Sequence, residues 1–162
     1  MARQFSLVAQ IPPVMLLAPA ADAAGRASPY RSLKGALKAY VVAHINQGAA
    51  NTVALTLNQA TAVAGTSPKA ITAVPIWSNL DTSLNDTLTA RTAAASYTTD
   101  AGIKDKIVVF EITPESCMDI AGGYDCISLS TGASAAACIT EAQLHILQSY
   151  HSAVPALSSY TD

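Results

Sequence analysis

The sequence has few charged residues and no run of them. Lys, Arg, Asp and Glu make up 12% of the 162 residues, about half the fraction usual in soluble domains. The net charge is −2, and no cluster of Lys or Arg occurs along the chain. Because nucleic acids are bound by several converging cations, we expect no direct nucleic-acid binding. A surface with so little charge is typical of a protein that packs against other chains.

Cysteine is also scarce, and the three cysteines, Cys117, Cys126 and Cys138, are irregularly spaced. Their odd number and the lack of a CxxC pair argue against a disulfide framework, a zinc site and a redox pair. We expect three reduced, mostly buried thiols, as in proteins made in a reducing cytoplasm. The alternative that the spacing allows is a Cys117–Cys126 bridge across the Gly122-Gly123 turn.

The first 35 residues are apolar but lack an uninterrupted apolar run. Gln10 and the Pro12-Pro13 pair split the run into pieces shorter than the ~7–15 residues of a signal-peptide core. Prolines and Asp22 interrupt every window of ~20 residues that could cross a membrane. Residues 1–35 are therefore predicted to form an extended, Pro-rich arm that lies in a groove on a partner. A cleaved signal peptide and a disordered tail are the alternatives. The residues predicted to bind the partner are Pro12, Pro13, Val14, Met15, Leu16, Leu17 and Tyr30.

After residue 35 the chain lacks repeats and consists of short segments separated by turn residues. The predicted strands cover residues 38–45, 51–59, 70–79, 107–112, 124–130 and 138–150. The last of these also fits a helix, a short helix is an option at 100–104, and residues 80–99 are predicted to be a long excursion with one short strand. This pattern predicts an all-β, antiparallel sandwich or barrel-like domain over residues 36–150, followed by a C-terminal tail at 151–162.

Details of these strands lead to finer predictions. Residues 38–45 and 51–59 are expected to pair as a β-hairpin. Pro75 places its strand at a sheet edge or a bulge. Trp77, the single tryptophan, is predicted to be a core or interface anchor. The nearly continuous apolar run at 107–112 predicts a strand buried on both faces.

The sequence also lacks a recognisable set of catalytic residues. His44 lies in a predicted strand, where a structural role fits better than a catalytic one. His145 and His151 match no metal-ligand spacing, and the scattered aspartates lack the spacing of a calcium loop. No serine lies in a GxSxG elbow. We therefore expect no enzyme activity, no metal and no cofactor.

Four motifs, in their order along the chain, resemble a family of small virion proteins of tailed bacteriophages that are encoded near the major capsid protein. The resemblance extends over about residues 25–150. The motifs are HINQG at 44–48, IWSNLDT at 76–82, KDKIVVFEI at 104–112 and AGGYDCISLSTGAS at 121–134.

The resemblance implies a structural virion protein, most specifically a capsid decoration (cement) protein. Such a protein binds the outer face of the major capsid protein lattice and stabilises the head, after synthesis in the host cytoplasm. The expected partners are the major capsid protein and further copies of this chain, with a trimer favoured, and neither nucleic acid nor membrane. The alternatives are a neck or tail component and, if residues 1–23 are a signal peptide, a secreted β-sandwich carbohydrate-binding module.

Overall fold

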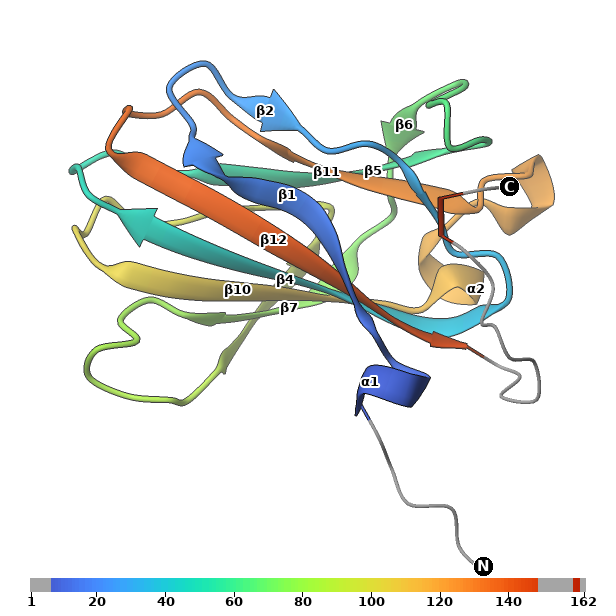
Figure 1. Ribbon diagram of the computed structural model, residues 1–162, viewed down its shortest axis with the longest axis horizontal. Coiled ribbons are helices and arrows are strands. Elements are labelled where there is room, and N and C mark those ends of the chain that lie inside the picture. The colour runs from blue at the N-terminus through green and yellow to red at the C-terminus, as the bar shows by residue number, and fades with distance from the viewer. Residues whose placement is uncertain (1–6, 149–158, 161–162) are drawn as a thin grey trace, which may run out of the picture.

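The chain folds into two antiparallel β-sheets packed face to face (Figure 1). The computed structural model describes residues 7–148 and 159–160. The predicted all-β sandwich is confirmed, and over these residues the sheets do not close into a barrel. The predicted tail at 151–162 lies outside the described residues except for Ser159 and Tyr160.

Sheet A contains six strands and brings the two ends of the described chain together at one side. The central strands pair along their full lengths, since β4 contacts β12 on one side and β10 on the other. In spatial order the strands are β1 (Pro13–Ala21), β12 (Cys138–Gln148), β4 (Ala36–Gln47), β10 (Asp105–Ile112), β7 (Val74–Asn79) and β8 (Thr89–Ala94).

Sheet B is built on two longer strands with short segments at their edges. Its strands are β2 (Arg26–Ala27), β11 (Cys126–Thr131), β5 (Ala54–Ala60) and β6 (Lys69–Ala70), with β3 (Arg31–Ser32) on β11 and β9 (Ser96–Thr98) on β5. The helices are short: α1 (Leu7–Gln10), α2 (Pro114–Cys117) and the 3-10 turn η1 (Ile120–Gly122).

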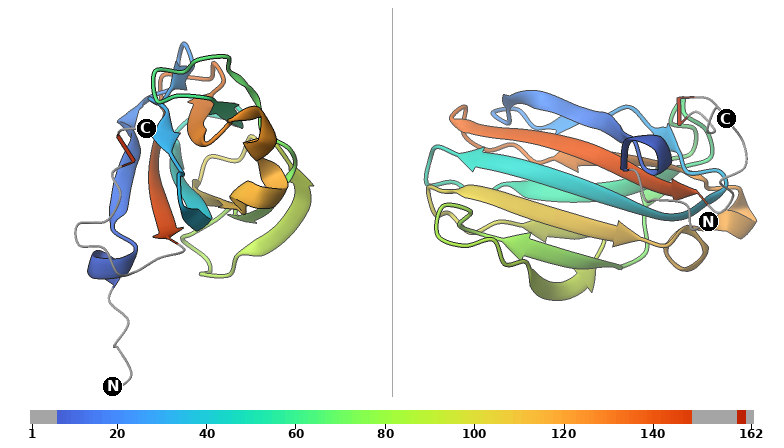
Figure 2. Two further views of the ribbon diagram at one scale, coloured as in Figure 1. Left: turned by 90° about the vertical axis from the view of Figure 1, so that its right-hand side faces the viewer. Right: turned by 60° about the horizontal axis from the view of Figure 1, so that its bottom comes forward.

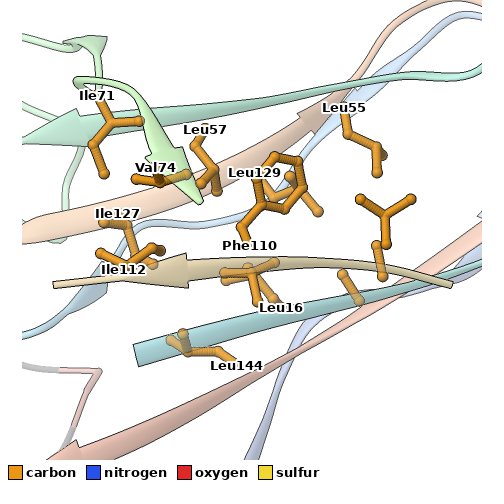
Figure 3. Close-up of a cluster of buried hydrophobic side chains, with 14 of the residues drawn as sticks. Leu16, Leu55, Leu57, Ile71, Val74, Phe110, Ile112, Ile127, Leu129 and Leu144 are labelled. Atoms are coloured by element: carbon orange, nitrogen blue, oxygen red, sulfur yellow. The ribbon is translucent and has the colours of Figure 1, made fainter. Parts of the chain in front are cut away.

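The core lies between the sheets and is made by alternate residues of each strand. Successive side chains of a strand point to opposite faces, so every second residue of β4, β10 and β12 is buried. Phe110 and Leu144 of sheet A meet Leu57 and Leu129 of sheet B in this interior (Figure 3). The prediction that 107–112 is buried on both faces is wrong, because Val108 is fully buried whereas Val109 is half-buried on the outer side.

Residues 1–6 of the predicted N-terminal arm lie outside the described residues, and over the rest the prediction is wrong, because residues 13–21 are strand β1 of the sandwich itself. β1 pairs with β12, and Leu16 and Leu17, 3% and 5% exposed, belong to the core. Pro13 and Pro19 are tolerated because an edge strand needs hydrogen bonds on one side only. The predicted boundary at residue 35 therefore does not separate an arm from a domain.

The predicted hairpin of 38–45 with 51–59 is wrong as well. Both segments are strands, but β4 is in sheet A and β5 is in sheet B. β12 and β10 occupy both edges of β4, so the chain passes to the other sheet through the largely exposed residues 48–52 instead of turning back. The apolar faces of β4 and β5 then face each other across the core.

Two further strand predictions are confirmed, and two helical alternatives are wrong. Pro75 lies at a register shift between β7 and β8, as its bulge prediction required. Residues 138–148 form a strand, so the helical alternative is wrong. Residues 100–104 form a bend, not a helix. The Asp100 carboxylate there accepts a hydrogen bond from the Gly102 N–H (2.8 Å).

Both edge strands of sheet A carry features that oppose the addition of another strand. β1 has its prolines and two register shifts. β8 has the extra residue of the shift beside Pro75, and its Arg91 lies opposite the buried Ile76, with Nε donating to Ser78 Oγ (2.7 Å). Prolines, bulges and inward charges are the usual protection of sheet edges. These features disfavour the addition of another strand at either edge of sheet A.

Candidate interaction surface on the outer face of sheet A

A continuous row of outward side chains crosses five strands of sheet A. Each residue is the direct cross-strand neighbour of the next. Met15 and Trp77 end the row and are 46% and 37% exposed, and the two valines between them are half-buried. We call this the Met15–Trp77 row; its members are Met15, Gln143, Val42, Val109 and Trp77.

Most of this face is uncovered in the described part of the chain. The right-hand view of Figure 2 shows the strands of sheet A side by side, with the short helix α1 in front of one end. At that end His145 is partly buried, and this burial lowers its pKa from the ordinary value of 6.5, against the opposing effect of a backbone hydrogen bond with Ile11. Within the described residues, no second layer covers the apolar side chains that β1, β4, β10 and β7 contribute to the row.

Polar pairs border the row on either side. Lys38 and Glu111 form an ion pair, and the hydrogen bond with Glu111 raises the pKa of Lys38. On the other side His44 Nδ1 lies 2.9 Å from Glu141 Oε1. An apolar centre with a polar border is the usual composition of a protein–protein interface.

A pocket of about 380 Å³ opens beside the His44–Glu141 pair. Its apolar walls come from Pro19, Ile107 and Ile139, and its polar groups include Asp105. Three strands and the end of β1 therefore contribute to it. We call it the sheet A pocket.

The structure separates the residues that the sequence predicts as partner contacts. Met15 joins the outer face, and Pro12 and Pro13 are exposed where β1 begins. Leu16 and Leu17 are internal and Val14 packs against the same core, so these three are not free to anchor the chain in a groove on a partner.

Tyr30 lies away from this surface, in the chain between β2 and β3 of sheet B. Its ring packs so closely on Gly65 that a Cβ there would be 3.0 Å from the ring, and Gly65 has a φ of +78°. A larger residue at position 65 would meet both a clash and backbone strain.

Sequence reasoning missed Val42 and Val109 and gave Trp77 an uncertain place between core and interface. Alternation could have identified the two valines as outward. Each directly follows a valine that points into the core, and successive residues of a strand point to opposite faces. Their alignment into one row depends on strand pairing, which the sequence does not state.

The buried amine of Lys106 belongs to the fold and is not free for chemistry. Its Nζ donates to Gln47 Oε1 (3.0 Å), to the Asp100 carbonyl (2.8 Å) and to Asp100 Oδ1 (2.7 Å). The hydrogen bond from Lys106 also lowers the pKa of Asp100. With its three donors used, Lys106 fixes the bend at 100–104 against β4.

The cysteines, the metal-ligating side chains and the helices of the described chain bear on other classes of site. None of the three cysteines forms a disulfide within the described residues, and their expected burial is confirmed. Residues 7–148 and 159–160 contain no group of three or more His, Cys, Asp or Glu side chains placed to hold a metal ion. In the same residues no helix is long and apolar enough to span a membrane.

Comparison of the chain with models of known protein families, with curated proteins and with solved structures finds no match.

Proposed function

We propose that this chain is a structural protein of a bacteriophage virion, a decoration protein that binds the outside of the major capsid protein lattice and stabilises the head. The observation that carries the proposal is the uncovered Met15–Trp77 row. The four sequence motifs that resemble phage virion proteins supply the identity of the partner. The role is structural and not enzymatic, and the protein reaches the virion from the host cytoplasm.

The outer face of sheet A suits permanent attachment to another protein. Burying an exposed Met or Trp side chain contributes about 1.5–3 kcal/mol before ordering costs. Specific interfaces bury ~1,600 Å² in total, which a face of several strands can supply. The low charge, 12% of residues, leaves little to be desolvated when the face is covered.

The protected edges of sheet A support docking by the face. Addition of a strand from the capsid would meet prolines at β1 and a bulge with Arg91 at β8. A face-on contact leaves both edges exposed to water, which can hydrogen-bond the backbone groups beside the prolines and the bulge. Several copies on one capsid symmetry axis, as in the favoured trimer, would add avidity to a modest single-site affinity.

The test uses heads that lack this protein and measures how many sites purified protein fills. The variant Met15→Ala/Trp77→Ala should bind at least ~10-fold more weakly, which corresponds to ~1.4 kcal/mol. The matched control is Leu84→Ala/Ile120→Ala, which truncates two exposed apolar side chains elsewhere and should bind as the native chain does.

Each result decides between named alternatives. Equal binding by the Met15/Trp77 variant would show that another surface is used. Failure of the native protein to bind heads would reject the decoration role. Native protein recovered from virions as a single ring of copies would indicate the neck or tail instead.

A further inference from the structure

The sheet A pocket is continuous with the proposed docking face. Two cross-strand rows line it: Glu141–His44–Ile107, and Ile139–Asn46–Asp105. The first of these lies two residues along each strand from the Met15–Trp77 row and on the same face. A partner that covers the row therefore also covers the mouth of the pocket.

The two carboxylates of the pocket lack the lysine or arginine partner that half of the acids of the described chain have. Asp105 Oδ1 accepts a hydrogen bond from Asn46 Nδ2 (2.7 Å), and Glu141 Oε1 is hydrogen-bonded to His44 Nδ1 (2.9 Å). Within residues 7–148 neither forms an ion pair with a lysine or arginine. The acids that do form one are Asp22, Asp81, Asp100, Glu111 and Asp119.

The two nearby lysines do not neutralise these carboxylates. Lys104 Nζ is 2.6 Å from Asp81 Oδ2. The Lys106 side chain is buried and directed to Gln47 and Asp100. Asp105 and Glu141 therefore line the pocket without a lysine or arginine partner in the described residues, and the third titratable group there is His44, which is hydrogen-bonded to Glu141.

Apolar walls and unneutralised carboxylates together select a particular kind of side chain. A long aliphatic stem is stabilised by contact with Pro19, Ile107 and Ile139. A cationic end is stabilised by the two carboxylates, and an arginine or lysine has both parts. A purely aliphatic side chain would leave the carboxylates unpaired and desolvated at an interface, which is costly.

We infer that the sheet A pocket is an anchor site for one arginine or lysine side chain of the partner that docks on sheet A. The identity of that partner rests on the proposed function, whereas the chemistry of the pocket does not. Burial of the aliphatic stem and pairing of its charge make such a residue an anchor at one border of the interface. Arginine in a pocket ringed by less critical contacts is a common arrangement of this kind.

The first experiment tests the chemistry without any capsid. Nα-acetyl-arginine methylamide and Nα-acetyl-lysine methylamide are titrated into the full chain, and the methyl resonances of Ile107 and Ile139 are followed by NMR. Saturable shifts are expected with both probes. The uncharged, aliphatic Nα-acetyl-norleucine methylamide should bind at least ~10-fold more weakly.

Two double variants make the result specific. Asp105→Asn/Glu141→Gln keeps the shape of the pocket and should weaken binding of the cationic probes at least ~10-fold. Asp86→Asn/Glu115→Gln removes the same charge from exposed positions outside the pocket and should bind as the native chain does. Equal shifts with the norleucine probe, or equal binding by the pocket variant, would overturn the inference.

The second experiment separates this inference from the decoration role. If native protein fills heads, the Asp105/Glu141 variant should fill them at least ~10-fold more weakly and the Asp86/Glu115 variant should not. Equal filling by both variants rejects the anchor pocket and leaves the decoration role standing. If native protein fails on heads but binds the cationic probes, the decoration role is rejected and the anchor pocket stands.

Discussion

Asp22 and Arg26 form an ion pair that ties strand β1 to both sheets. Asp22 Oδ1 is 3.1 Å from Arg26 Nε and accepts from the Thr131 hydroxyl of sheet B (2.8 Å). Asp22 Oδ2 accepts from the Thr140 hydroxyl of sheet A (2.5 Å). The Arg26 guanidinium in turn donates to the carbonyls of Ala18, Ala20 and Thr140. One carboxylate, fully buried, therefore organises the turn after β1.

Asp22→Asn should destabilise the fold by about 3 kcal/mol, because Arg26 loses its counter-charge and one threonine hydroxyl loses its acceptor. Denaturant unfolding of the variant measures this as a lower midpoint. Asp86→Asn, at an exposed position, is the control and should change stability by less than ~0.5 kcal/mol. Equal midpoints for the two variants would show that the pair is not coupled to folding.

Val108 and Val109 offer a matched test of which face of β10 is the core. Val108→Asp places an unpaired charge in the interior, a cost comparable to the ~5–15 kcal/mol by which a whole domain is stable. Soluble folded protein should not form. Val109→Asp changes the half-buried outer face and should yield a folded sandwich. Circular dichroism and solubility of the two variants check this, and a reversed result would place the core on the other side.

These valines also show how far the sequence could predict the fold. Alternation is a local property, so it located β4, β5, β10 and β12 correctly. Strand pairing is not local. The sequence therefore did not show that β5 belongs to sheet B instead of pairing with β4 in sheet A. The assumption that Val109 is buried came from counting apolar residues in a run, although the alternation in Val108–Ile112 already distinguished two faces.

The candidate surface was less predictable than the fold. Prolines at 12, 13 and 19 were interpreted as evidence for a segment outside the domain. Prolines are also compatible with an edge strand, but the sequence does not show which strand will lie at an edge. The row from Met15 to Trp77 collects residues from five separate strands, and its existence depends on their register. Deletion of residues 2–24 would remove β1 with the buried Leu16, Leu17 and Asp22, and so disrupt the fold.

Trp77 should be accessible in the free protein. It is the only tryptophan, so tryptophan fluorescence reports on it alone. Iodide should quench this fluorescence in the native protein. Trp77→Phe should change stability by less than ~1.5 kcal/mol, whereas Phe110→Ala in the core should cost about 3–5 kcal/mol. Emission that iodide quenches only after unfolding would contradict the exposed position.

The three cysteines should be reduced and protected. Each is buried and none forms a disulfide within the described residues, so native protein should react slowly with a thiol reagent, and denatured, non-reduced protein should titrate for three thiols. A single reactive thiol after denaturation would show that two of them form a disulfide. Rapid reaction of native protein would show that the core opens readily at β11 or β12.

His145 should make stability depend on pH near neutrality. Burial lowers its pKa in the folded state from 6.5, so at mildly acidic pH the unfolded chain binds this proton more readily than the folded chain does. The contribution of His145 to the free energy of unfolding is therefore fully present above about pH 6.5. It is lost as the pH falls through that value towards the lower pKa of the folded state. His145→Gln removes this group, so the variant should lose less stability than the native chain between pH 7.5 and pH 5.5, as measured by denaturant midpoints. Parallel pH profiles for the two proteins would show that α1 does not restrict solvent at this end of the sheet.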